Sequence, residues 1–352
     1  MKILYIITLS DLGGAQAVVY NLANDQVKRG NEVMVVSGNG NYEWTNLDEH
    51  VKLLKLDYLH REIGVKDFLV LMKFIRLRYS FCPDIVHLHS SKMGVLGRLA
   101  FRKRNVVYTV HGFDSVRMAN RKFLFLERLL KNRAASIVGV CRYDYNALLE
   151  EGIKKNVTYI YNGVPDMCSC PFEGDEETET LREIEDIKKR YSKVVMCIAR
   201  DAKQKKIDLF FDLARACQNY AFVWIGNLNQ YENVPENAFL LGSKVNAYKY
   251  WQLADLCVLP SNYEGLPISI IEALSYSVPV VASNVGGVAE ILDGTNGYAI
   301  ENDVTLYAEK IRYALDEENW SRLSKAARRS YENHFTIDKM VNSYNDIYKK
   351  MF

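Results

Sequence analysis

Residues 255–290 alternate short apolar runs with a polar turn and an apolar helical pattern. An apolar run at Leu256–Leu259 leads through a polar turn to a helix that opens at Pro267, where a missing N–H costs least. A second apolar run follows at 279–283. Strand, turn, helix and strand in this order predict a parallel βαβ unit. Such a unit restricts the chain to an α/β fold in which helices cover a parallel sheet.

Two carboxylates bracket the start of this helix, Glu264 in the turn and Glu272 within the helix. Ligands of parallel α/β sheets bind at the carboxyl ends of strands, where helix N-termini direct free N–H groups. An ionised carboxylate only accepts hydrogen bonds, so the pair suits ligand hydroxyls. A solvated surface position is the alternative for Glu272, but the apolar neighbours Ile271 and Ala273 argue against it.

Apolar runs and helical segments alternate along the whole chain. With 352 residues the chain is too long for one core and suits two domains. We therefore predict an α/β fold of two Rossmann-like domains, 1–165 and 166–335, whose parallel sheets face each other across a cleft. Segment 166–185, rich in Glu and Thr, is expected to be a solvated connector or a mobile helix. Strands are expected at 2–8, 32–37, 51–56, 84–89, 106–111, 136–140, 157–161, 194–198, 222–226, 239–242, 256–259 and 279–283.

The net charge of +2 hides an asymmetry, because Lys and Arg are in excess in residues 1–160 and Asp and Glu in the remainder. Basic clusters interleaved with apolar residues lie at 65–78, 98–104 and 117–133. The plain interpretation is a set of amphipathic helices with solvated basic faces. The sharper hypothesis is peripheral contact with anionic lipid headgroups. Nucleic acid fits less well, since no known binding motif accompanies the charge.

Several features bear on the compartment. No apolar run reaches about 20 residues, the length that spans a bilayer, and residues 1–10 are expected to form a first strand and not a signal peptide. Seven scattered cysteines indicate a reducing environment. Cys168 and Cys170 lack a second ligand pair, so a plain loop is favoured over a metal site. We expect a cytoplasmic protein, with a peripheral position on the inner face of the membrane as the alternative.

The first domain offers two candidate binding features. Gly13-Gly14, between the first strand and first helix, lets backbone N–H groups approach a phosphate, although a tight turn explains the pair about as well. His111 ends a strand and precedes a glycine, which places it at the ligand edge; the alternative is a histidine that only caps the strand. His87 and His89 are expected to point to opposite faces of their strand, which argues against a metal pair.

A basic loop follows the strand at 194–198 and carries Arg200 and Lys205. Fixed cations at a strand end stabilise negative charge that grows on a departing diphosphate. Arginine can bind two phosphate oxygens at once, and lysine supplies a compact charge. The alternative is an ordinary basic loop in an acidic domain.

Taken together, these segments resemble the signature of retaining glycosyltransferase family 4, the two-Rossmann-domain (GT-B) glycosyl transferases of group 1. Family positions that are commonly glycine are Ala199, Lys206, Pro267 and Ser277 in this sequence. The matching residues are Leu259-Pro260-Ser261, Glu264-Gly265-Leu266-Pro267, Glu272-Ala273, Pro279-Val280-Val281-Ala282, Gly286-Gly287-Val288-Ala289-Glu290, and Arg200 with Lys205 and Asp208.

The resemblance implies transfer of a sugar, with retention, from a UDP- or GDP-linked donor to an acceptor hydroxyl in polysaccharide or glycolipid synthesis. It implies a glycan or lipid-linked glycan acceptor, no cofactor and no metal, and a C-terminal helix at 336–352 that packs back on the first domain. The expected catalytic residues are His111, Arg200, Lys205 and Glu264. The expected donor-binding residues are Gly13, Gly14, Gly242, Ser243, Gly265, Leu266, Pro267, Ile268 and Glu272.

Three alternatives remain open. A nucleotide-sugar epimerase of the same shape would need acid and base residues beside the sugar, and no convincing set is visible. A dinucleotide-dependent oxidoreductase would need a Gly-x-Gly-x-x-Gly turn after the first strand, which Gly13-Gly14 does not supply. A non-catalytic module of a glycan-synthesis complex is separated from an enzyme only by an assay.

Overall fold

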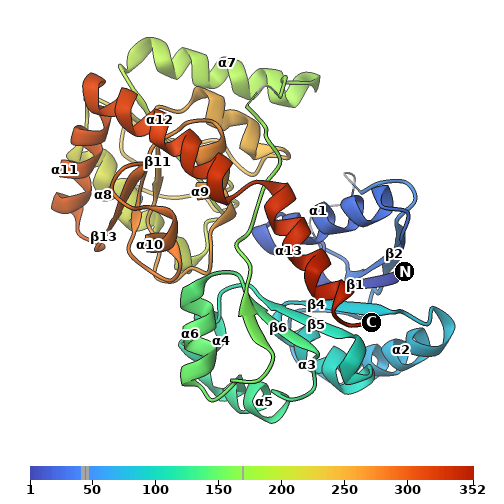
Figure 1. The fold of residues 1–352 in the computed structure, drawn as a ribbon. Helices are drawn as coiled ribbons and strands as arrows, with labels where there is room; N and C mark the ends of the chain where they lie inside the picture. The colour runs from blue at the N-terminus through green and yellow to red at the C-terminus, as the bar shows by residue number, and fades with distance from the viewer. Residues whose placement is uncertain (41–43, 45–46, 169) are drawn as a thin grey trace. The chain divides into compact units, whose positions relative to one another are not determined.

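The structure, a computed structural model, describes residues 1–40, 44, 47–168 and 170–352 (Figure 1). It divides into two compact units. Unit 1 comprises residues 1–163 together with 337–352, and unit 2 comprises residues 164–336. No helix within the described residues is both long enough and apolar enough to cross a bilayer.

Unit 1 contains a seven-stranded sheet in the order β3-β2-β1-β4-β5-β6-β7, and all neighbouring strands are parallel. The central strands β4 and β5 are buried along their whole length, as expected for strands covered by helices on both faces. The order reverses between β1 and β4, which is where α/β sheets bind ligands. The strands are β1 Lys2–Leu9, β2 Glu32–Gly38, β3 Lys52–Lys55, β4 Ile85–His89, β5 Val106–Val110, β6 Ser136–Gly139 and β7 Val157–Tyr159.

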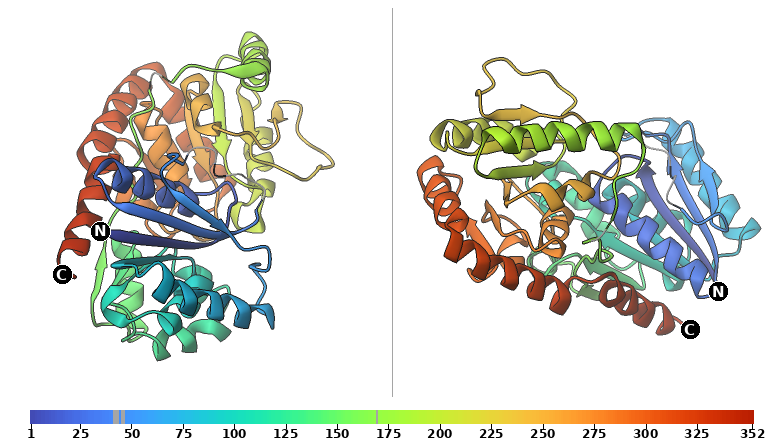
Figure 2. Two further views of the ribbon diagram at one scale, coloured as in Figure 1. Left: turned by 90° about the vertical axis from the view of Figure 1, so that its right-hand side faces the viewer. Right: turned by 90° about the horizontal axis from the view of Figure 1, so that it is seen from above.

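Two groups of helices cover this sheet. Helices α1 and α13 lie on one face, and α2, α3 and α5 lie on the other (Figures 1 and 2). The Gln26 amide of α1 donates a 2.5 Å hydrogen bond to Asn345 of α13, so the last helix of the chain is an integral part of unit 1. The helices are α1 Gly14–Lys28, α2 Lys66–Ser80, α3 Ser91–Ala100, α4 Asp114–Arg117, α5 Leu124–Leu129, α6 Arg142–Glu150 and α13 Ile337–Lys349, with short 3₁₀ turns η1 Lys103–Asn105 and η2 Arg121–Phe123.

Unit 2 repeats the plan with six parallel strands in the order β10-β9-β8-β11-β12-β13. Here the order reverses between β8 and β11. The strands are β8 Val194–Ile198, β9 Ala221–Ile225, β10 Ala238–Leu240, β11 Leu256–Leu259, β12 Val280–Ser283 and β13 Gly297–Ile300. The helices are α7 Gly174–Arg190, α8 Ile207–Ala216, α9 Ile268–Ser275, α10 Val288–Ile291, α11 Val304–Leu315 and α12 Glu317–His334, with 3₁₀ segments η3 Lys203–Lys205 and η4 Ala247–Leu253.

The predicted α/β class with two Rossmann-like units is confirmed, and every predicted strand is present within two residues at each end. One strand was missed: β13 is mostly half-buried and offers no continuous apolar run. Of the two expectations for segment 166–185, the helix is confirmed from Gly174 onward, where α7 begins, and the purely solvated connector is wrong for this part because α7 buries Thr180, Ile184 and Ile187. Three buried residues in 17, of which two are apolar, are too few to stand out from the many charged residues of this helix.

Two positions where the family commonly has glycine adopt the left-handed backbone conformation. Lys206 has φ +44° and Ser277 has φ +62°. The left-handed conformation costs a residue with a Cβ about 1–2 kcal/mol of free energy, a cost that glycine does not have. At these two places the chain therefore has a side chain where glycine would be free of this cost.

We expect Lys206→Gly to raise the free energy of unfolding by about 0.5–1 kcal/mol, because relief of the left-handed strain exceeds the extra chain entropy of glycine. Lys206→Ala is the matched control, since it removes the same charge and keeps the strain. Thermal unfolding of both variants measures the difference. Equal stabilities for the two variants would contradict the argument.

Candidate functional site

The carboxyl edge of the unit 2 sheet brings together two of the predicted catalytic residues. Lys205 follows β8, and Glu264 follows the adjacent strand β11. The Lys205 Nζ donates to Glu264 Oε1 at 2.5 Å, and the Ser261 hydroxyl donates to the same oxygen at 2.6 Å. The Lys205 side chain is 17% exposed and that of Glu264 is 7% exposed. The pair is therefore largely shielded from water, and no described residue bonds Glu264 Oε2.

The loops that carry this pair are joined through their backbones. The Asn262 N–H donates to the Gln204 carbonyl at 2.8 Å, and the Gln204 amide donates to the Tyr263 carbonyl at 2.6 Å. These bonds hold the turn after β8 against the turn after β11. The positions of Lys205 and Glu264 are thus set by the loops before any ligand binds.

A third loop, after β12, supports the same turn. Gly286 has φ +56°, and a Cβ at this position would lie 1.9 Å from the Glu264 carbonyl oxygen. The neighbouring Gly287 N–H donates to the Gly265 carbonyl at 2.8 Å. Glycine is required at 286 because the two backbones approach more closely there than a side chain allows.

Glu272 lies on α9, five residues into the helix that follows this turn. The helix begins at Ile268 with Pro267 as its N-cap, one residue later than predicted, so of the segment Gly265–Ile268 expected to bind the donor only Ile268 supplies a helical N–H group. Burial raises the pKa of Glu272 to about 7, an effect that the Trp251 side chain opposes. Burial therefore moves the titration of this carboxyl toward the neutral pH range.

The remaining unit 2 candidates also follow strands of this sheet. Arg200 is exposed after β8. Gly242 and Ser243 follow β10, where Gly242 has φ +76° and its carbonyl accepts from Gly226 N–H at 2.7 Å. All parallel strands end at one edge, so these residues lie along the edge that carries Lys205 and Glu264.

In unit 1, Gly13 and His111 also follow parallel strands, β1 and β5. Gly13 is extended at φ 177° and caps α1, which starts at Gly14. The backbone after His111 is fixed by Asp144 of α6, whose carboxylate accepts from Gly112 N–H at 3.2 Å and Phe113 N–H at 2.8 Å. Burial raises the pKa of Asp144 to about 6 and lowers that of His111 to about 4. His111 is accordingly neutral at pH 7.

The expected divergence of His87 and His89 is wrong. Residues two apart on a strand share a face, and the two rings lie 4.1 Å apart. His89 Nδ1 lies 2.9 Å from His111 Nε2, while His87 bonds Tyr348 and Thr109. Within the described part of the chain, no group of three His, Cys, Asp or Glu residues is arranged to hold a metal.

Three residues that support these sites were not found from the sequence: Ser261, His89 and Asp144. Ser261 belongs to the matched Leu-Pro-Ser segment and could have been singled out there. Asp144 lies 32 residues from the backbone that it binds, and no motif marks it.

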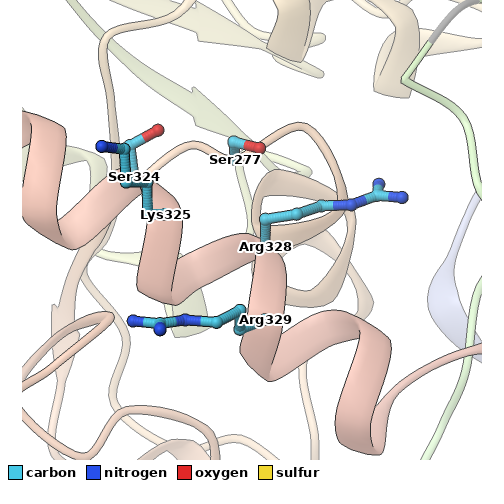
Figure 3. A pocket seen from close by; sticks show the side chains of 5 residues that line it. All are labelled: Ser277, Ser324, Lys325, Arg328 and Arg329. Carbon is cyan, nitrogen blue, oxygen red and sulfur yellow. The ribbon is translucent and has the colours of Figure 1, made fainter.

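Unit 2 also has a pocket that none of these candidate residues line. It is lined by Ser277, Ser324, Lys325, Arg328 and Arg329 (Figure 3). The Arg328 guanidinium donates to Asp166 Oδ1 at 2.9 Å and to the Ser275 carbonyl at 2.7 Å, and it holds the pKa of Asp166 well below its usual value. Arg328 thus joins the start of unit 2 to α12, which is a structural role.

Two family models match the chain. Residues 12–166 match Glycosyltransferase Family 4, and residues 192–317 match Glycosyl transferases group 1. The two matches together span most of both units.

Curated relatives and solved structures agree with these matches. The UDP-Gal:alpha-D-GlcNAc-diphosphoundecaprenol alpha-1,3-galactosyltransferase of Escherichia coli is 28% identical over 335 residues, 87% of this chain and 85% of that protein. The O-antigen biosynthesis glycosyltransferase WbnH of Escherichia coli is 25% identical over 97% of this chain and 98% of its own. Anabaena Alr3699/HepE in complex with UDP and glucose superimposes with a TM-score of 0.81 at 18% identity, covering 98% of each chain. With the two parallel sheets and the matched signature, these findings show that the chain belongs to glycosyltransferase family 4, the group 1 glycosyl transferases of GT-B fold.

Proposed function

We propose that this glycosyltransferase moves a sugar from a nucleoside-diphosphate sugar to an acceptor hydroxyl with retention at the anomeric carbon. The observation that carries the proposal is the shielded Lys205–Glu264 pair at the point where the unit 2 strand order reverses. A cation and a carboxylate held side by side can bind the two ends of a sugar phosphate. Lysine faces the phosphate oxygens, and the carboxylate accepts from the sugar hydroxyls.

In this mechanism the bond between the anomeric carbon and the phosphate oxygen breaks, and the electron pair leaves with the nucleoside diphosphate. Lys205, Arg200 and the N–H groups at the start of α9 stabilise the charge that grows on the phosphate. The acceptor oxygen forms the new bond on the same face of the sugar and passes its proton to the departing phosphate. No metal is required in this scheme, so we expect activity to survive EDTA.

The nature of the substrates is proposed from the relatives. The Escherichia coli relative is named for a UDP-linked donor and a diphosphoundecaprenol-linked acceptor. HepE has been solved with UDP-glucose. For this chain we propose a UDP- or GDP-linked hexose as donor and a lipid-linked glycan as acceptor, in polysaccharide or glycolipid synthesis.

A thermal-shift panel of UDP, GDP, ADP, CMP and NAD tests the donor. We expect one nucleoside diphosphate to stabilise the wild-type protein. The same ligand should stabilise Glu272→Gln much less, because an amide accepts hydrogen bonds from ribose hydroxyls less strongly than a carboxylate. Stabilisation by NAD alone would overturn the proposal.

Without ligand, Glu272→Gln should be more stable than the wild type at pH 8. Because the pKa of Glu272 is raised from 4.5 to about 7 in the folded protein, the folded state holds the proton more tightly than the unfolded chain. Wild-type stability therefore falls as the pH rises from about 4.5 to about 7, by on the order of 1 kcal/mol or more. Thermal unfolding from pH 4 to pH 8 should show the two proteins converging at the acid end.

We also propose that unit 1 contacts anionic membranes through one face of its helices, here termed the α2–α5 face. On α2, Phe68, Leu69 and Met72 are exposed and follow Val65, which is 95% exposed, at helical spacing. Helices α3 and α5 lie on the same side of the sheet (Figure 1). Leu99 of α3 and Phe125 and Leu129 of α5 are also exposed, and these helices carry the cations Lys66, Lys73, Arg76 and Arg128.

Exposed apolar side chains beside cations suit a bilayer with acidic headgroups. We expect Phe68→Ser/Leu69→Ser to weaken binding to phosphatidylglycerol vesicles by roughly tenfold. Leu228→Ser is the control, because Leu228 is equally exposed but lies in unit 2. Co-sedimentation at low and high salt measures both, and wild-type indifference to lipid charge would remove the idea.

A further inference from the structure

The ring of His111 is held by one hydrogen bond from a neighbouring strand. His89, the last residue of β4, places its Nδ1 2.9 Å from His111 Nε2, and the two rings stack at 5.2 Å with 24° between their planes. The bond occupies Nε2 of His111. Among the residues that the structure describes, none bonds His111 Nδ1, so Nδ1 is the nitrogen that remains for a ligand.

His89 has no other hydrogen bond within the described residues. It is fully buried, and its Nε2 has no partner there. The nearest polar ring, His87, cannot supply one, because its Nδ1 bonds the Tyr348 hydroxyl and its Nε2 bonds the Thr109 hydroxyl, each at 2.7 Å. The interaction with His111 is therefore the one bond that orients the His89 ring.

Both rings of the pair are neutral at pH 7. Burial lowers the pKa of His111 to about 4 and holds that of His89 well below its usual value, with smaller contributions to His89 from the two neighbouring histidines. A neutral imidazole carries one N–H and one acceptor nitrogen. A single proton must then lie between His89 Nδ1 and His111 Nε2, so the two rings share one tautomer: both are protonated on Nδ1, or both on Nε2.

We propose that His89 is a positioning residue that fixes the orientation and the tautomer of His111. The chemical role of His111 Nδ1, as donor or acceptor toward a sugar hydroxyl, is then decided by a buried residue on the adjacent strand. The catalytic consequence rests on the proposed function of His111. The shared proton is independent of that function, and it can be measured without substrate.

The test is ¹⁵N-edited NMR of the histidine side chains, of which the chain has six. In the wild type we expect one downfield imidazole proton coupled to nitrogens of both His89 and His111, and the same tautomer in both rings. In His89→Leu this proton should disappear and His111 should show a mixture of tautomers. Different tautomers in the two wild-type rings, or an unchanged His111 in His89→Leu, would overturn the proposal.

Two further variants separate positioning from folding. His87→Leu removes an equally buried ring from the same strand together with two hydrogen bonds, so it should cost stability and leave the shared proton in place. His89→Gln keeps an amide that can bond His111 Nε2. We expect His89→Leu to lower kcat/KM about tenfold and His89→Gln to recover part of that loss. If the wild type transfers no sugar, the NMR result still decides the role of His89.

Discussion

Replacing Lys205 by methionine is expected to lower kcat/KM for sugar transfer by roughly 100- to 1,000-fold, because the variant loses a fixed positive charge where the diphosphate gains negative charge. Methionine keeps a flexible, unbranched side chain only one heavy atom shorter and removes the donor to Glu264. Steady-state kinetics at saturating acceptor measure the change. A rise in KM alone would show that Lys205 serves only to bind the donor.

The same substitution should destabilise unit 2 by about 1–3 kcal/mol, since Glu264 would remain buried with the Ser261 hydroxyl, but no cation, as a side-chain donor among the described residues. The double variant Lys205→Met/Glu264→Gln should recover much of this stability and none of the activity. Lys203→Met, at an exposed position two residues earlier, is the control for loss of charge in the loop. Recovery of activity in the double variant would mean that Lys205 acts only by neutralising Glu264.

Gly286→Ala is expected to be the most disruptive single methyl addition in unit 2. A Cβ at 1.9 Å from the Glu264 carbonyl cannot be accommodated without moving the turn that carries the carboxylate. We expect a loss of several kcal/mol of stability, of the size seen for overpacked sites with added backbone strain. Activity should fall more than the folded fraction does, because the displaced turn also carries Glu264.

Gly294→Ala is the matched control for Gly286→Ala. Gly294 also has a positive φ, +87°, but a Cβ there meets nothing within 4 Å. It should show only the left-handed penalty of about 1–2 kcal/mol. Chemical denaturation and sugar-transfer assays on both variants measure how much of the loss comes from the contact with the Glu264 carbonyl. Equal losses of stability and activity in the two variants would mean that the backbone conformation alone causes them.

Much of the fold could be predicted from the sequence because parallel strands buried on both faces leave continuous apolar runs. The strands β8 and β11 have the predicted bounds for this reason. Strand β13 was missed, and the buried face of α7 was not predicted, because both elements are only partly buried and rich in polar residues. The positions of Lys205 and Glu264 at the ligand-binding edge could be predicted for the same reason, because each residue follows a strand that the sequence reveals.

The contacts themselves required the structure. Lys205 and Glu264 are 59 residues apart, and only the pairing of β8 with β11 brings them together. Asp144 acts on the backbone beside His111 from a helix with no motif. The error over His87 and His89 was one of periodicity, because alternate residues on a strand share a face. That error concealed the bond between His89 and His111.

The return of α13 to unit 1 has a consequence for the order of folding during synthesis. The hydroxyl of Tyr348 completes the hydrogen bonds of His87, a residue made long before it. Unit 2 is continuous in sequence and can close as soon as it leaves the ribosome. Unit 1 is translated first, but the polar groups that α13 covers, such as His87, lack their partners until residues 337–352 emerge. The later half of the chain can therefore reach its native state before the earlier half does.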